Sequence, residues 1–427
     1  MYLTGEEKAM LNGESGRLVS EAMRFLVTLG DVFEAERMID ISYTNIGMAS
    51  RFWGKGWLTV ELVEDAIKQG VKVRVPSTFN NCGLGDPSTP ETIWETLRVS
   101  EEAKQRIVWE NEIARALGIV PTCTCSPYLI CDTRACPVGS HICTVESSAI
   151  VYFNSVLGIR TERDCVASLF AGLTGKYPAH GFHLDENRLG TIHFKVEEDM
   201  TSKLDFGLLG MLAGERSGDG VPVFSGISHP DTEELMELSA SLASSGRVTM
   251  FHIEGITPEA HDLRAAFGGK EPSETVTITR TDFDAMYDEL SDTEGNVDFV
   301  CLGCPHYSIY EMQKVAELLK GRRVHNGVTL WICTSPATAM MAGLAGYADT
   351  IQNAGAMIMT GPNFCTVAGP GCPGPEYSFS HPEYSVGAIA TDAAKQAYYA
   401  RSNLRARKVF LGSRDQCIDA AVTGQWR

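Results

Sequence analysis

Carboxylate, hydroxyl and thiol side chains are concentrated in one segment of the chain, residues 121–158. Glu146 and Ser147 lie near its centre, directly before the apolar run AIVYFNSVLG. This pair could carry acid–base chemistry or bind substrate, although Glu146 could equally be a structural carboxylate at a helix N-terminus. The segment also contains five of the 13 cysteines of the chain: Cys123, Cys125, Cys131, Cys136 and Cys143.

Three cysteine motifs each follow a strand-like run and could supply ligands to one metal site. Cys125 lies in CTCSPY, Cys304 in LGCPHYS and Cys365 in GPNFCTVAG. Three thiolates can hold an iron–sulfur cluster and leave one iron without a protein ligand, and such an iron can act as a Lewis acid. The CxC and CxxC spacings are not strong metal signatures, so on spacing alone buried packing cysteines remain the default interpretation.

Other candidate residues are individually ambiguous. Lys395 in TDAAKQAYY could bind an anionic group or be solvated surface, and His180 and His183 could be hydrogen-bonding loop residues. The dinucleotide-binding, Walker, nucleophile-elbow and HExxH motifs do not occur in the sequence, which removes several large enzyme classes.

Helical and strand-like patterns alternate along the chain. Residues 4–29 have a helical pattern in which Thr4 is the N-cap and Glu7 follows three positions later, as in a capping box. The strand-like segment MIDISYT at 38–44 and the amphipathic helical segment at 56–70 come next. Such alternation predicts parallel strands connected by crossover helices.

We therefore expect an α/β fold with several parallel or mixed sheets and crossover helices. The N-terminal α/β portion is predicted to cover 1–220 and the C-terminal α/β portion 221–427. Functional residues of such sheets gather on loops at the carboxyl ends of strands. Segments 77–81, 123–128 and 301–308 follow strand-like runs, so they are expected to share one crevice.

The composition describes an ordinary globular protein with an acidic surface. The chain has 427 residues, 44% of them hydrophobic, and a net charge of −18. This charge argues against nucleic acid or an anionic membrane as partner. The acidic N-terminus is unlike a signal peptide, and no run of about 20 apolar residues could span a bilayer, so we expect a cytoplasmic protein.

Several motifs in a shared order resemble the large subunit, or catalytic large domain, of the aconitase X family. They include MYLTGEEKAMLNGESG, VRVPSTFN, CTCSPYL, ESSAIVYFNSVLGIRT, GFHLDENR, LGCPHYSIYE, TDAAKQAYY and VFLGSRDQCIDAAVTG. The resemblance implies an aconitase-like fold and an iron–sulfur hydro-lyase, one that dehydrates mevalonate 5-phosphate or cis-3-hydroxy-L-proline. Both substrates carry a hydroxyl β to a carboxylate.

The resemblance also implies roles for individual residues. The ligands of a 4Fe–4S, 3Fe–4S or 2Fe–2S cluster would be Cys125, Cys304 and Cys365. The catalytic residues would be Glu146, Ser147 and Lys395. Substrate would be bound by these three and by four further residues: Gly47, Met48, Asn80 and Asn81.

The family further implies a partner. Its members have a small swivelling domain that carries an active-site serine, and since this sequence ends just after the large-domain motif, we expect that domain as a separate small subunit. The sequence also departs from the family pattern, with Asn363 and Phe364 before Cys365 where members commonly have Asp-Thr, and with no histidine within SYTNIG at 42–47. Cysteines without a family counterpart are Cys82, Cys123, Cys131, Cys136 and Cys143.

These departures bear on the substrate more than on the fold. A β-hydroxy carboxylate is expected, with mevalonate 5-phosphate ahead of cis-3-hydroxy-L-proline, because the separate small subunit and the GCPH form around Cys304 resemble the phosphate-using branch. The alternative from another class is a non-catalytic iron–sulfur protein. A fourth cysteine ligand such as Cys123 would favour that alternative.

Overall fold

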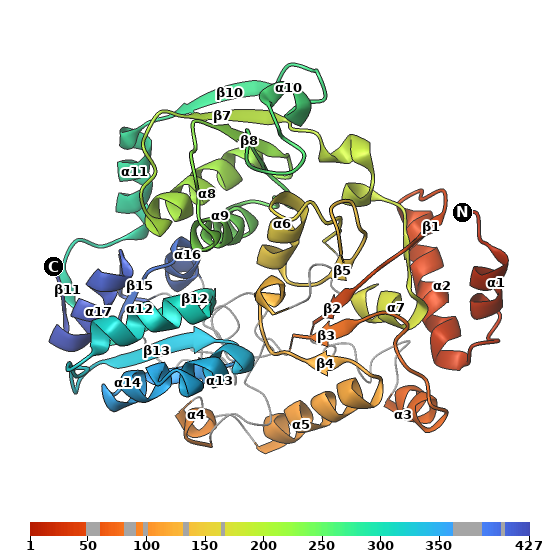
Figure 1. Cartoon of the computed structure of the whole chain (residues 1–427), viewed down its shortest axis with the longest axis horizontal. Helices are drawn as coiled ribbons and strands as arrows, with labels where there is room; N and C mark the ends of the chain where they lie inside the picture. Colours follow the sequence, from red (N-terminus) through yellow and green to blue (C-terminus); the bar gives the residue numbers. More distant parts are fainter. Residues whose placement is uncertain are drawn as a thin grey trace.

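The computed structural model of this chain contains three successive α/β units (Figure 1). Their main sheets are all parallel, which confirms the predicted α/β class. In the part of the chain that is described, no helix is long and apolar enough to cross a membrane. The described residues are 1–47, 60–80, 91–96, 101–130, 136–163, 167–361, 387–402 and 406–427.

The first unit is built on a four-stranded sheet with the strand order β4-β3-β2-β5. Its strands are β2 (Thr44–Ile46), β3 (Ser77–Phe79), β4 (Val120–Pro121) and β5 (Cys143–Thr144). An antiparallel pair is formed by β1 (Met38–Asp40) and β6 (Lys176–Pro178). The helices are α1 (Gly5–Leu11), α2 (Arg17–Val32), α3 (Val60–Lys68), α4 (Glu91–Thr96), α5 (Glu101–Ala116), η1 (Pro127–Leu129), α6 (Ser147–Ser155) and α7 (Ala167–Thr174).

The first predicted helix has the expected start and a different end. The side chain of Thr4 accepts a hydrogen bond from the Glu7 amide, and the Glu7 carboxylate accepts one from the Thr4 amide at 2.7 Å, so the capping box is confirmed. The helical pattern then divides into α1 and α2 and does not run unbroken to residue 29. Gly13 and Gly16, at φ 90° and 93°, make the turn between the two helices.

The second unit is built on the parallel sheet β10-β7-β8-β9. Its strands are β7 (Ile192–Val196), β8 (Pro222–Ser225), β9 (His252–Ile253) and β10 (Glu274–Ile278). Its helices are η3 (Gly181–His183), η4 (Asp185–Arg188), α8 (Lys203–Ser217), α9 (Thr232–Ser245), α10 (Leu263–Ala266) and α11 (Arg280–Leu290).

The third unit is a doubly wound sheet with the order β14-β13-β12-β15-β16. Its strands are β12 (Phe299–Tyr307), β13 (Thr329–Thr334), β14 (Met357–Thr360), β15 (Ala388–Thr391) and β16 (Lys408–Leu411), and β11 (Gly295–Asn296) pairs with β17 (Gln425–Trp426). Its helices are α12 (Ile309–Leu319), α13 (Pro336–Leu344), α14 (Tyr347–Asn353), α16 (Ala394–Ser402) and α17 (Arg414–Thr423). The winding reverses between β12 and β15, and the carboxyl ends flanking such a switch point usually form the binding crevice.

Helix α9 connects the three units. It packs against α8 of its own unit, against α6 of the first unit, and against α16 and β12 of the third. Figure 1 shows α6, α9 and α16 meeting near the middle of the molecule. Helix α9 therefore supports α6, α16 and β12 together.

Gly303, directly before Cys304, is predicted to be intolerant of any side chain. Its φ is +98°, and a Cβ atom would lie 2.1 Å from the backbone oxygen of Cys333. Gly303→Ala should lower the free energy of unfolding by about 2 kcal/mol or more, because a strained backbone and a clash with a neighbouring strand are both introduced. Urea denaturation measures this change.

Gly343 in α13 is the matched control. A Cβ atom there would meet nothing within 4 Å, so Gly343→Ala should be neutral or stabilise the helix by about 0.5–1 kcal/mol. Equal stability of Gly303→Ala and the unsubstituted chain would contradict this account of the β12 end.

Candidate active site

The carboxyl end of β12 contributes a thiol and an imidazole to the switch point. Cys304 and His306 are each only 1% exposed, and every residue of β12 is buried. Burial lowers the pKa of His306 to about 3, so its imidazole is neutral at physiological pH. The Nε2 atom of His306 has no hydrogen-bond partner in the described part of the chain.

The CTCSPY loop after β4 meets this strand end directly. The amide of His306 donates a hydrogen bond to Sγ of Cys125 at 3.3 Å, and the Nδ1 atom of His306 lies 3.1 Å from Oγ1 of Thr124. Two of the three predicted cluster ligands, Cys125 in a loop of the first unit and Cys304 within β12 of the third, thus lie on segments that touch each other. The third, Cys365, lies outside the described residues.

The described donors fit an iron–sulfur cluster. Cys125 and Cys304 are buried and not in disulfides, and thiolates are the usual ligands of such clusters. The His306 amide donates to the sulfur of Cys125, and amide hydrogen bonds to ligand sulfurs are one of the contacts by which proteins tune such centres. Among the described residues no group of three or more His, Cys, Asp or Glu side chains is arranged to hold a metal ion, and Cys365 is not among them.

The additional cysteines are divided between the cores and the undescribed segments. Cys136 and Cys143 pack within hydrophobic clusters of buried side chains, as the packing interpretation expects. Cys123 is buried and has a positive φ of 47°. Cys82 and Cys131 lie outside the described residues.

The predicted acid–base and anion-binding residues come together at the N-terminus of α6. Lys395 in the first turn of α16 places its Nζ 3.8 Å from Oε1 of Glu146, and it donates a hydrogen bond to Oγ of Ser148 at 2.9 Å. Lys395 is 5% exposed. The sequence alone did not identify Ser148, because it could not tell which of two adjacent serines at the start of a helix turns toward the lysine. Ser147 is the first residue of α6 and is half-buried.

Two predicted substrate-binding residues lie at neighbouring strand ends of the first sheet. Gly47 follows β2 and Asn80 follows β3, and the amide of Asn80 donates to the carbonyl of Ile46 at 2.8 Å. Asn80 is 1% exposed, and its Nδ2 atom has no hydrogen-bond partner within the described ranges. Met48 and Asn81, predicted beside them, fall outside those ranges.

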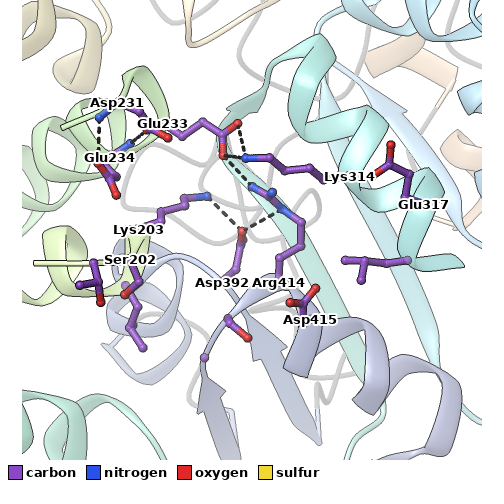
Figure 2. Close-up of a pocket in the computed structure, with 15 residues that line it drawn as sticks. Ser202, Lys203, Asp231, Glu233, Glu234, Lys314, Glu317, Asp392, Arg414 and Asp415 are labelled. Atoms are coloured by element: carbon purple, nitrogen blue, oxygen red, sulfur yellow. Dashed lines mark hydrogen bonds and ion pairs between the residues drawn. The ribbon is translucent and has the colours of Figure 1, made fainter. Parts of the chain in front are cut away.

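A buried ion network adjoins the ends of β12 and β15 (Figure 2). Asp392 accepts hydrogen bonds from Nζ of Lys203 at 3.1 Å and from the hydroxyl of Tyr307 at 2.5 Å. Arg414 donates to that same hydroxyl at 3.1 Å and to Glu311 at 2.9 Å. Asp392 precedes Lys395 by three residues, and Tyr307 follows Cys304 by three. The network therefore holds the segment that carries Lys395 next to the strand that carries Cys304.

Charge complementarity favours the ionised forms of Asp392 and Lys203. Burial alone would raise the pKa of Asp392, but Lys203 and Arg414 outweigh burial and hold the pKa of Asp392 below its ordinary value. Burial works against the charge on Lys203 as well, and Asp392 foremost, followed by Glu311, more than compensates, so the pKa of Lys203 is raised.

A cavity of about 580 Å³ is lined in part by Asp392. Figure 2 shows it between the N-termini of α8, α9 and α17 and the side of α12. Its walls carry both signs of charge, with Glu233 paired to Lys314 and Arg414. None of the predicted site residues lines it, and no sequence motif indicated it.

Comparison with known proteins gives three informative matches. The chain is 38% identical over 373 residues to the phosphomevalonate dehydratase large subunit of Methanothermobacter thermautotrophicus, covering 87% of this chain and 89% of that one. It is 33% identical to the cis-3-hydroxy-L-proline dehydratase of Pseudomonas aeruginosa over 98% of this chain and 70% of that one. The crystal structure of holo-form aconitase X from Thermococcus kodakaraensis superposes with a TM-score of 0.78 at 32% identity, covering 99% of this chain and 100% of that one.

Family models cover nearly the entire sequence in the same order as the three units. The aconitase X first domain matches residues 1–186, the second domain 190–288 and the third domain 297–423. The resemblance inferred from the motifs is confirmed by these matches and by the similarity of fold. The chain belongs to the aconitase X family.

Proposed function

We propose that this chain is the large subunit of an iron–sulfur dehydratase that acts on a β-hydroxy carboxylate, with mevalonate 5-phosphate as its substrate. The observation that carries the proposal is the meeting of Lys395 with Glu146 and Ser148, where Lys395 follows β15, the strand that pairs with the Cys304-containing β12. Relatives above 30% identity are named as dehydratases, which supports the reaction class.

The reaction requires three contributions from the site. Elimination of water removes a proton from the carbon α to the carboxylate and a hydroxyl from the β carbon. It therefore needs a base, assistance for the leaving hydroxyl, and a cation or hydrogen-bond donors for the charge that builds up on the carboxylate. The side chains at the α6 and α16 N-termini can supply the first and third of these.

Lys395 and Glu146 divide this work between them. Lys395 is a buried cation that approaches Glu146 at 3.8 Å, so a substrate carboxylate bound by its ammonium group would lie beside a carboxylate base. We assign the removal of the α-proton to Glu146 and the stabilisation of the developing negative charge to Lys395. Ser148 orients the lysine through its hydrogen bond, and Ser147 at the first position of α6 is assigned to substrate binding.

Assistance to the leaving hydroxyl is assigned to the part of the site that contains the three predicted cysteine ligands. Cys125, Cys304 and Cys365 would hold the cluster, and an iron without a protein ligand supplies Lewis-acid assistance when the cluster is bound. Gly47 and Asn80, with Met48 and Asn81, are proposed to line the remaining wall against the substrate.

A small subunit and a cytoplasmic location complete the proposal. The relative from Methanothermobacter thermautotrophicus is named a large subunit, and 89% of its length is matched by this chain, whereas the hydroxyproline dehydratase is matched over only 70% of its own length. The name of that relative and its higher identity, 38% against 33%, favour the two-subunit, phosphate-using type. Dehydration of cis-3-hydroxy-L-proline is the second candidate, supported by the 33% identity to that enzyme.

The cysteine assignment predicts which thiols retain iron. Cys125→Ala and Cys304→Ala, each purified anaerobically, should lose the iron, the acid-labile sulfide and the visible absorption of the cluster, because each removes a ligand. Cys417→Ala is the matched control, since Cys417 is fully buried in a separate hydrophobic cluster, and it should keep its iron. Full iron content in either ligand variant would refute the assignment.

The partner assignment predicts that turnover depends on a second chain. The purified large chain should dehydrate neither mevalonate 5-phosphate nor cis-3-hydroxy-L-proline, and addition of the small subunit from the same genome should start turnover of mevalonate 5-phosphate only. Product formation followed by mass spectrometry measures both. Turnover by the large chain alone would argue against the partner, and turnover of the hydroxyproline only would favour the second candidate.

The role of Lys395 predicts a specific kinetic loss. Lys395→Ala should lower kcat/KM about 10²–10³-fold, as removal of one stabilising group in a dehydrated site usually does. Lys314→Ala is the control, because this half-exposed lysine pairs with Glu233 away from the site, and its kinetics should match those of the unsubstituted enzyme. Unchanged kcat/KM in Lys395→Ala would remove the lysine from the mechanism.

A further inference from the structure

Helix α16, which carries Lys395, does not contain its own N-terminal cap. The residue before its first position is Ala393, which has no side-chain oxygen, and the first turn has no acidic residue. By contrast, α8, α9, α12 and α17 in the same region each begin with a serine or aspartate that accepts a hydrogen bond from the first turn. The first amides of α16 must therefore be satisfied from elsewhere.

A residue of another unit supplies the missing acceptor. Glu237 of α9 is fully buried, and its Oε1 atom accepts a hydrogen bond from the amide of Ala394 at 2.8 Å. Ala394 is the first residue of α16 and directly precedes Lys395. The carboxyl group of α9 thus contacts the backbone one residue away from the side chain proposed to bind the substrate.

Capping a helix with a buried carboxyl group costs free energy, because an ionisable group is removed from water. A local serine or aspartate would cap α16 as it caps its neighbours, without moving an ionisable group out of water. What the distant carboxyl adds is a fixed position relative to α9. Helix α9 also packs against α6. The hydrogen bond to Glu237 therefore fixes Lys395 relative to the helix whose N-terminus carries Glu146 and Ser148.

The acceptor works in its uncharged form. Burial raises the pKa of Glu237 to about 8, despite Lys203 at 3.9 Å, so the carboxyl is mainly protonated at pH 7. Its Oε2 atom has no hydrogen-bond partner within the described residues. An amide oxygen could therefore replace Oε1 with little loss.

We propose that Glu237 is a positioning residue for the dehydration: by capping α16 from α9, it fixes Lys395 against Ser148 and Glu146. This inference rests on the proposed function of Lys395. It assigns a role to a residue of the second unit that carries no substrate contact of its own.

The first experiment measures the cap without turnover. Hydrogen exchange of the α16 amides should become faster in Glu237→Met, which fills the same space without a comparable acceptor, and should stay slow in Glu237→Gln. Unchanged exchange in Glu237→Met would overturn the cap. This readout holds even if the enzyme proves to act on a different substrate, so failure of the proposed function and failure of the cap are distinguishable.

The second experiment measures positioning in the complex with the small subunit. Glu237→Met should lower kcat/KM about 10–100-fold, because small displacements of a reacting group have effects of this size. Glu237→Gln should retain kcat/KM within about threefold. Ser413→Ala, which removes the cap of the neighbouring helix α17, is the control: it should lower Tm like Glu237→Met but leave kcat/KM unchanged.

A double substitution separates positioning from general loss of structure. In the Lys395→Ala background, Glu237→Met should change the residual kcat/KM less than about twofold, because two residues that act as one unit are not additive. Multiplicative losses, or equal losses in Glu237→Gln and Glu237→Met, would overturn the proposal. If Glu237→Met does not fold, Glu237→Asp replaces it, because its shorter side chain withdraws the acceptor by one methylene. The hydrogen exchange, the kcat/KM and the double substitution with Lys395→Ala are then measured with Glu237→Asp.

Discussion

A charge can be buried in a protein only where neighbouring groups offset the loss of water, and this constraint governs the centre of the molecule. Lys203 from the second unit and Arg414 from the third, with side chains 15% and 12% exposed, pair with the buried Asp392 and Glu311. Removing one member of such a set typically costs about 3–5 kcal/mol, since the remaining charge is left unpaired. The segment after β15 and the end of β12 are therefore held in one arrangement, and both contribute to the site.

This constraint explains why the site is assembled from separate units. The strands of the first sheet are only two or three residues long. The CTCSPY loop comes from the first unit, the end of β12 and Lys395 come from the third, and α9 of the second supports both α6 and α16. Loss of the packing on α9 would separate Glu146 from Lys395, so folding of the three units and formation of the site are linked.

Local patterns in the sequence predicted local structure well and long-range partners poorly. The capping box at Thr4, the alternation of helices and strands, and the placement of Cys125 after β4 all follow from nearest neighbours and periodicity. Cys304 is predicted in a loop after a strand, but it lies within β12 itself, because the strand continues through the GCPH motif to Tyr307. The hydrogen bond from Ala394 to Glu237 joins residues 157 positions apart, and no periodic pattern marks either of them. Which of Ser147 and Ser148 contacts Lys395 likewise depends on the rotation of α6 about its axis, which the sequence alone does not determine.

The acidic charge of the chain and an anionic substrate are compatible because the two act over different distances. A net charge of −18 repels anions through the solvent, but at physiological ionic strength this field is screened within about 8 Å. Lys395 is 5% exposed and acts where water is largely excluded, so its attraction for a carboxylate is much less screened. In the proposed function, selectivity for an anion would therefore be set by one desolvated cation and its fixed neighbours, and the same burial would make the orientation of α16 decisive.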